Sequence, residues 1–213
     1  MKKSWYLMLL MAGILCSGCL SMTGGTARTV EPGESSSAVG TSLVINPNGG
    51  VYPAPQYIHR WGQSERVDLG IRIIGLGVLM EPRLQLLRSE DEDWGLDVLT
   101  GLKAGALVDA VFGDDFFAPI PVFFLEVPLV IGWNFSWGQI FGVGKGTVRR
   151  TPLPIDIGTV WTASGGLGFA VDVTDTVQII PDILVSITNP EDYFPQFEEP
   201  FALQAGLALV FTR

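Results

Sequence analysis

Charged residues, histidine and cysteine are all scarce in this chain of 213 residues. Charged side chains make up 16% of the sequence, against about 25% in a typical soluble domain. His59 is the single histidine, so any catalytic scheme that needs an imidazole must use this one position. The two cysteines, Cys16 and Cys19, both lie near the N-terminus. This placement excludes a disulfide framework in the rest of the sequence.

Long apolar runs and excess positive charge are also missing. After residue 18, no uninterrupted apolar run approaches the roughly 20 residues that a transmembrane helix needs. The 22 acidic residues outnumber the 13 basic ones and give a net charge of -9, which disfavours nucleic acid as a partner. Yet 47% of the residues are hydrophobic. This combination favours a β-barrel in a membrane or an unusually apolar soluble β protein.

The N-terminus has the pattern of a secretory signal peptide. Lys2 and Lys3 precede an apolar stretch from Trp5 to Leu15 that is too short to cross a bilayer. The next residues, Leu15-Cys16-Ser17-Gly18-Cys19, resemble the lipobox of bacterial lipoproteins, with Cys16 in place of the usual leucine. The resemblance implies a signal peptide over 1–18 and a diacylated Cys19 as the new N-terminus. A redox Cys-x-x-Cys site is disfavoured because a leader offers no βαβ context.

Most of the remaining chain alternates between apolar residues and small or polar ones. Between Trp94 and Ala106, for example, the even positions are mostly apolar and the odd ones mostly glycine or charged. A period of two predicts antiparallel sheet. We predict a lipidated N-terminus and tether over 19–33 and a β-barrel domain over 34–213. The ten predicted strands cover approximately 34–45, 55–62, 66–75, 77–88, 94–107, 118–134, 138–147, 155–173, 176–188 and 200–212.

The connections between these strands mostly alternate between long and short. The long ones cover 46–54, 108–117, 148–154 and 189–199, and the short ones cover 62–65, 136–137 and 174–175. Single-chain outer-membrane barrels have short periplasmic turns and longer outer loops. We therefore predict an all-β fold, a single antiparallel up-and-down transmembrane β-barrel of about ten strands. Eight strands is the alternative, because the connection at 75–77 is short on the long-loop side.

The two faces of the predicted strands differ in a way that assigns them to lipid and lumen. One face carries glycine, alanine and serine with a few charges of both signs, which suits a narrow lumen with a polar network. Its predicted members are Asp68, Arg72, Glu81, Arg83, Asp97, Lys103, Glu126 and Asp182. The other face is apolar, and aromatic residues near strand ends predict girdles at the membrane interfaces. The predicted girdle residues are Trp94, Trp133, Trp137, Trp161, Phe201 and Phe211.

Taken as a whole, the mature chain resembles the small outer-membrane β-barrels of Gram-negative bacteria. The stretch from Arg60 to Ile73, RWGQSERVDLGIRI, has the strand, tight polar turn and strand of exported barrel-like proteins. The resemblance implies an outer-membrane protein, anchored through Cys19 on the periplasmic side, with membrane lipid and lipopolysaccharide as partners. These families include adhesins, narrow channels and lipid-modifying enzymes, so the fold leaves the activity open.

Few residues carry chemistry by themselves. His59 with Ser64 would be a candidate pair for a lipid-acting enzyme, but Ser64 lies in a predicted periplasmic turn, which favours a non-catalytic histidine. Asp109, Asp114 and Asp115 match no calcium-loop spacing and predict a solvated acidic loop without a metal. The glycines are spread through strands rather than gathered in a phosphate-binding loop, so no cofactor is expected.

The predicted outer loops hold the candidate binding residues. Tyr193, Phe194 and Phe197 lie among acidic residues in 189–200 and form a candidate site for a protein partner. Lys145, Arg149 and Arg150 could pair with lipopolysaccharide phosphates or be ordinary rim charge. We predict a lipid-anchored outer-membrane barrel with a structural or surface-interaction role and specificity in 108–117 and 189–199. The alternatives are a narrow channel, a lipid-acting enzyme using His59, and a soluble lipocalin-like carrier.

Overall fold

The computed structural model describes residues 25–45, 51–91, 93–113, 116–150, 159–189 and 201–213. The strands within these ranges are β1 (Ser35–Ile45), β2 (Val51–Ser64), β3 (Val67–Ile74), β4 (Gly77–Leu87), β5 (Gly95–Gly101), β6 (Lys103–Gly113), β7 (Phe116–Phe135), β8 (Gly138–Arg150), β9 (Thr159–Thr174), β10 (Val177–Thr188) and β11 (Phe201–Thr212). The described part of the chain has no helix that is long and apolar enough to span a membrane.

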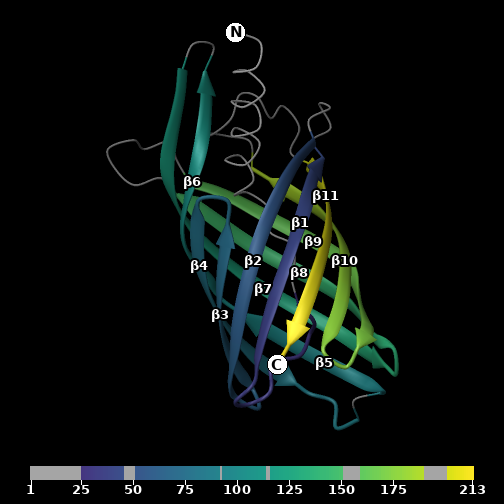
Figure 1. Ribbon diagram of the computed structural model, residues 1–213. Coiled ribbons are helices and arrows are strands. Elements are labelled where there is room, and N and C mark those ends of the chain that lie inside the picture. Colours follow the sequence, from purple (N-terminus) through teal and green to yellow (C-terminus); the bar gives the residue numbers. More distant parts are fainter. Residues whose placement is uncertain (1–24, 46–50, 92, 114–115, 151–158, 190–200) are drawn as a thin grey trace.

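The strands form one closed antiparallel barrel (Figure 1). Apart from β5 and β6, consecutive strands pair with each other, and β1 closes the ring by pairing with β11. Only Leu102 separates β5 from β6, and both pair with β4 on one side and with β7 on the other. The described strands therefore occupy ten positions around the barrel. The predicted up-and-down barrel of ten strands is confirmed, and the alternative of eight is wrong.

The bounds of several strands differ from the sequence-based expectation, whereas the connection at 75–77 is short, as expected. The predicted loop 108–117 is mostly strand, because β6 continues to Gly113 and β7 begins at Phe116. The short connection at Gly75 and Leu76 is a tight turn between β3 and β4, in which Gly75 has a φ of 50°. Glycine adopts this left-handed conformation without a steric penalty, so a two-residue turn suffices where a longer loop is usual.

Strand alternation places apolar side chains outside and polar ones inside. Along β7, Leu125, Val127 and Leu129 are exposed, whereas the alternate residues Glu126 and Val130 are buried. The same pattern leaves large apolar side chains exposed on most of the other described strands. A soluble lipocalin-like barrel has the opposite distribution, so the soluble-carrier alternative is wrong and the fold is that of a transmembrane barrel.

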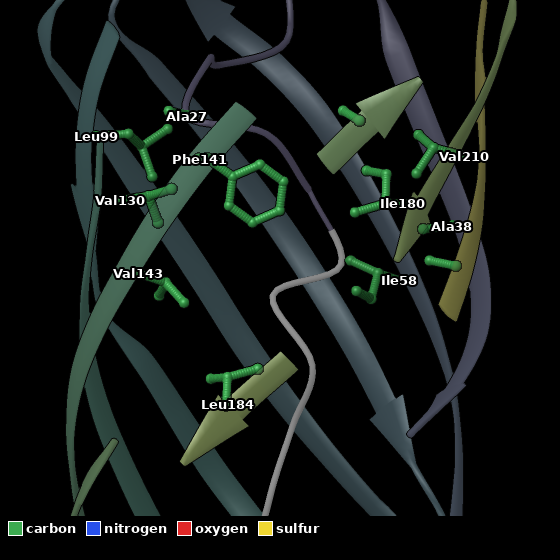
Figure 2. Packing of buried hydrophobic residues seen from close by; sticks show 12 residues of the cluster. Ala27, Ala38, Ile58, Leu99, Val130, Phe141, Val143, Ile180, Leu184 and Val210 are labelled. Atoms are coloured by element: carbon green, nitrogen blue, oxygen red, sulfur yellow. The ribbon is translucent and has the colours of Figure 1, made fainter. Parts of the chain in front are cut away.

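The lumen also contains an apolar cluster. Figure 2 shows Phe141 between Ala27, Leu99 and Val130 on one side and side chains that include Ile180 on the other. Ala27 belongs to the segment that precedes β1, so this segment lies inside the barrel. Gly132 makes room for it: a Cβ there would lie 2.7 Å from the Cβ of Ala27. A second cluster, near the turn between β3 and β4, consists of Ile74, Leu79, Leu107 and Phe124.

Candidate functional site

The polar interior of the barrel is organised around shared carboxylates. Glu81 accepts a hydrogen bond from Arg60 at 2.8 Å and forms an ion pair with Arg72. Arg72 also donates to Gln56 at 2.7 Å. All four residues are buried. One carboxylate thus holds two cations from β2 and β3, and both of its oxygens accept hydrogen bonds.

A second group forms around Glu126 on β7. Lys103 lies 2.5 Å and Lys145 lies 3.3 Å from its carboxylate oxygens, and the Thr147 hydroxyl donates to it at 3.1 Å. The predicted surface cluster of Lys145, Arg149 and Arg150 does not form. Lys145 and Arg149 are buried, whereas Arg150 is exposed, because residues 149 and 150 point to opposite faces of β8.

The third group lies toward the end of the barrel where β1 begins and β11 ends, here called the turn end; the opposite end is called the loop end. Arg83 pairs with Asp68, with Nε 2.8 Å from Oδ1. Asp97 accepts from Asn134 at 2.8 Å and forms an ion pair of 3.0 Å with Arg28. The last predicted network member, Asp182, is likewise buried. All eight predicted residues therefore lie in the interior, but they belong to separate groups.

Residues 25–33, here called the lumen segment, pack inside the barrel, although the sequence suggested a tether. The Gln139 side-chain oxygen accepts from the Ala27 amide at 2.7 Å. The Gln85 amide group donates to the Ala27 carbonyl at 2.8 Å and accepts from the Thr29 amide at 2.7 Å. Asp68 accepts from the Val30 amide at 2.9 Å. Side chains of the barrel strands thus form hydrogen bonds with backbone groups of the lumen segment, which would otherwise be buried without partners.

The lumen segment runs from the turn end toward the middle of the barrel. Near Ser35 it meets β2, where the Gly33 amide donates to the Gly62 carbonyl at 3.3 Å. A side chain at Gly62 would collide with this segment, because its Cβ would lie 1.8 Å from the Glu31 carbonyl oxygen. At the other end, Gly25 lies beside the guanidinium groups of Arg60 and Arg83. The segment therefore occupies the turn-end half of the lumen.

The predicted girdle residues lie on the exterior at two levels. Trp94, Trp133, Trp137 and Phe211 are exposed near the turn end, and Trp161 and Phe201 are exposed near the loop end. At the turn end the rings contact one another: Trp94 and Trp133 have centroids 5.3 Å apart, and Phe135 stacks on Trp137 at 5.3 Å. Two aromatic levels are what the two interfaces of a membrane favour.

His59 lies on the exterior of β2 and has a serine neighbour other than the one considered from sequence. Its Nδ1 is hydrogen-bonded to Ser37 Oγ at 2.8 Å, and its ring lies edge-on to Trp61 at 4.5 Å. Ser64 instead accepts from the Arg66 amide at 3.4 Å. Ser37 and His59 are directly paired residues on β1 and β2, a contact that sequence spacing alone does not indicate.

Several predicted residues lie outside the described ranges: Cys19, Asp114, Asp115, Tyr193, Phe194 and Phe197. Asp109 lies on β6, paired with Ile120 of β7. Among the described residues, no group of three or more histidine, cysteine or acidic side chains could hold a metal ion.

The apolar exterior, the aromatic levels and the polar interior define a transmembrane β-barrel. No protein-family model matches the chain, and no curated protein matches its sequence. Solved structures with a similar fold include the outer membrane protease OmpT from Escherichia coli, with 8% identity and a TM-score of 0.39 over 92% of this chain and 97% of that one.

Two further similar structures are named for other roles. The translocator domain of the autotransporter NalP from Neisseria meningitidis has 10% identity and a TM-score of 0.42, over 99% of this chain and 94% of that one. Ail, the attachment invasion locus protein of Yersinia pestis, has 9% identity and a TM-score of 0.28, over 85% and 99%. At such identities the likeness concerns the fold alone, and no activity is transferred.

Proposed function

We propose that this chain is an outer-membrane barrel of a Gram-negative cell that acts through surface interaction, with a closed lumen and an acylated Cys19. The apolar exterior and its two aromatic levels support the membrane assignment. The start of β1, the end of β11 and the turns after β2, β7 and β9 share one end, and short turns are typical of the periplasmic end in single-chain outer-membrane barrels. The lumen segment and the charged groups fill the turn-end half of the interior, which disfavours the channel alternative.

One observation carries the surface-interaction role: β6 and β7 extend beyond the barrel as a free two-stranded ribbon (Figure 1). β6 pairs with β4 only up to Ala106, and β7 pairs with β8 only from Phe123. Among the residues that the structure describes, 107–113 and 116–122 therefore pair only with each other. At about 3.3 Å per residue these paired segments are roughly 20 Å long.

The composition of this ribbon suits contact with a partner. It contains Phe112, Phe116 and Phe117 close to its tip, and aromatic residues are enriched in protein interfaces. Pro119 and Pro121 lie on the β7 side. Proline lacks an amide donor, so it limits uncontrolled pairing with further strands. The ribbon thus favours recognition through side chains over aggregation through its edges.

The test is photo-crosslinking in intact cells, with a photoreactive phenylalanine analogue at position 112, 116 or 117. We expect a discrete crosslinked product that is lost when the other two phenylalanines are replaced by serine. The matched control carries the analogue at Trp137, in the turn on the opposite end. Absence of a product at all three ribbon positions would contradict the proposed role, while heat-modifiable migration on gels reports barrel folding independently.

An acylated Cys19 is compatible with the lumen segment but limits where the lipid can lie. Five residues lie between Cys19 and Gly25, and the six residue steps from one to the other span at most about 20 Å when fully extended. An acyl group would therefore enter the membrane close to a rim of the barrel. Intact mass spectrometry of the membrane-extracted protein tests the assignment. A mass that leaves no room for acyl chains on Cys19 would rule out the lipid anchor.

A second candidate function, hydrolysis of lipid esters, rests on the hydrogen bond between His59 and Ser37. The pair faces the lipid side near the turn end, and a histidine can accept the proton of a serine that attacks an ester carbonyl. Phospholipid hydrolysis by the purified barrel, lost in both His59→Ala and Ser37→Ala, would support it. Equal hydrolysis by either variant and the parent protein would eliminate it.

A further inference from the structure

We propose that a cluster of polar side chains on the outer surface of the barrel binds the phosphate group of a phospholipid. Its members are Ser37 on β1 and Tyr57 and His59 on β2, here called the outer polar cluster. The Ser37 hydroxyl lies 2.8 Å from Nδ1 of His59 and 3.4 Å from the Tyr57 hydroxyl. The proposal concerns binding alone and does not require the hydrolysis considered above, although a phospholipid held here would be in place as its substrate.

The outer polar cluster lies at the depth of a membrane interface. Ser37 is paired with Phe211, which belongs to the aromatic level near the turn end, and the ring of His59 lies edge-on to Trp61 at 4.5 Å. Aromatic rings are enriched at the level of the lipid headgroups. The phosphate groups of the leaflet at the turn end therefore lie beside the cluster. This placement rests on the membrane assignment of the proposed function, in which the turn end is periplasmic.

The cluster has more hydrogen-bond donors than its own hydrogen bonds use. Ser37 and Tyr57 each have one hydroxyl hydrogen, and a protonated histidine has two N–H groups, whereas the cluster contains two hydrogen bonds. Two donors therefore remain when His59 is protonated. None of the described residues outside the cluster accepts a hydrogen bond from these three side chains. A phosphate group has only acceptors and a negative charge, so it suits these donors.

The outer surface around the cluster is apolar. Tyr57 is paired with Val39, and Val39 is paired in turn with Leu209, both of which are exposed. A polar hydrogen without an acceptor is unfavourable in such surroundings. Val39 and Leu209 lie farther from the turn end than Ser37, where the acyl chains of a lipid would pass. A ligand with a phosphate at the cluster and acyl chains over these residues is a phospholipid rather than free phosphate.

The charge of His59 decides how strongly the cluster attracts an anion. Histidine is the side chain whose charge ordinarily changes between about pH 5 and 8. On the outer face of the described strands, the titratable or charged side chains nearest to it are Tyr57, Arg213, Glu65 and Arg66. Side chains of these types ordinarily keep one charge state over this range. A phosphate bound at the cluster should therefore be held more tightly as the pH falls.

The experiment is native mass spectrometry of the full-length barrel in detergent micelles. Phosphatidylglycerol is titrated in, and diacylglycerol with the same acyl chains is the comparison without phosphate. We expect one phosphatidylglycerol to bind about tenfold more tightly at about pH 5.5 than at about pH 8, and more tightly than diacylglycerol at both. Equal affinities for the two lipids would overturn the proposal. Excess inorganic phosphate should leave the phospholipid bound, and displacement by it would overturn the lipid assignment.

Variants of His59 separate recognition by the cluster from general lipid contact. His59→Phe keeps an aromatic ring beside Trp61 and should lower the affinity at the acidic pH about tenfold and abolish the pH dependence. His59→Gln should also abolish the pH dependence and serves if His59→Phe fails to fold. Thr41→Val removes another exposed hydroxyl of β1 and should bind like the parent protein. Unchanged pH dependence in a folded His59 variant would overturn the proposal.

The outcome for this lipid site is independent of the outcome for the ribbon. Photo-crosslinking at the ribbon reports the surface-interaction role at the opposite end of the barrel, and fatty-acid release from the same lipid reports hydrolysis. Loss of lipid binding with crosslinking retained would therefore overturn the lipid site alone, and the reverse result would overturn the ribbon assignment alone.

Discussion

At the scale of single residues, the shared carboxylates of the lumen dominate the energetics. Glu126 is buried between Lys103 and Lys145 and also accepts from Thr147. Removing one partner of a buried ion pair costs more than the pair itself contributes, because the remaining charge stays buried without compensation. Residues of this kind therefore tolerate substitution poorly even though they lie far from any surface that a partner could touch.

The corresponding prediction concerns Glu126→Gln. We expect it to lower the free energy of unfolding by about 3–5 kcal/mol, since two buried lysines lose their carboxylate. Urea unfolding in phospholipid vesicles, followed by tryptophan fluorescence, measures the change. Glu90→Gln is the matched control, because Glu90 is exposed and its neutralisation should change the free energy by less than about 0.5 kcal/mol. A loss of similar size in both variants would contradict the assigned role of Glu126.

The alternation of the sequence predicted the charged residues of the lumen better than its neutral polar residues. Asp97 and Lys103 stand out because a charge on one face of an apolar strand is conspicuous. Gln85 and Gln139 do not stand out, since a neutral amide is equally common on a solvent-exposed strand. Their partners are backbone groups of the lumen segment, a contact between distant parts of the chain that has no local sequence signal. Arg60 could have been found, because it shares the period-two register of Gln56 on β2.

At the scale of elements, the lumen segment and the ribbon are the two departures from a simple barrel. The tether prediction rested on glycine, serine and threonine content, which is typical of linkers but equally compatible with an extended segment bound by side chains. The predicted loop 108–117, with its acidic residues Asp109, Asp114 and Asp115, covers only part of the ribbon, since 118–122 lies within the predicted strand 118–134. Pairing between β6 and β7 overrides these local signals.

The lumen segment leads to a prediction about proteolysis. Arg28 is a trypsin site held in the lumen by its ion pair with Asp97, so the folded protein should resist cleavage there. Gln85→Ala removes the side chain that bonds both Ala27 and Thr29 and should increase the cleavage rate after Arg28 at least about tenfold, which corresponds to about 1.4 kcal/mol of easier local opening. N-terminal sequencing of the product identifies the site.

The control for this prediction is Gln63→Ala, because Gln63 is exposed at the turn end and has no role in holding the segment. Its cleavage rate should match that of the parent protein. Rapid cleavage after Arg28 in the parent protein itself would show that the segment is not held in the lumen.

At the scale of the whole molecule, the strand count and closure were predictable and the state of the lumen was not. Alternation, turn signals and alternating connection lengths gave ten strands without any knowledge of pairing. Whether a ten-stranded barrel is open depends on what fills it, which requires the positions of Phe141, Ala27 and the charged groups together. The sequence therefore left the channel alternative open, and the packing disfavours it.

Conductance measurement tests the closed state. We expect no stepwise currents from the full-length protein in planar bilayers, because the lumen segment and the groups around Glu81 and Glu126 block the path for hydrated ions. Deleting residues 25–33 removes the segment while β1 to β11 remain, and it should produce conductance steps. Steps from the full-length protein, at a frequency equal to that of the deletion variant, would show that the lumen is open.

The seam between β1 and β11 also has a consequence for biogenesis. It is the one pairing of described barrel strands that are not close neighbours along the chain, so it joins the first described strand to the last. The lumen segment ends where this seam begins: Gly62 donates to the Glu34 carbonyl, and Ser35 and Arg213 exchange two hydrogen bonds. A segment that binds Gln85 and Gln139 early would hold the start of β1 in place for β11. During insertion into the membrane, the strands would then assemble around the lumen segment, and this part of the chain would serve as an internal template for closing the barrel.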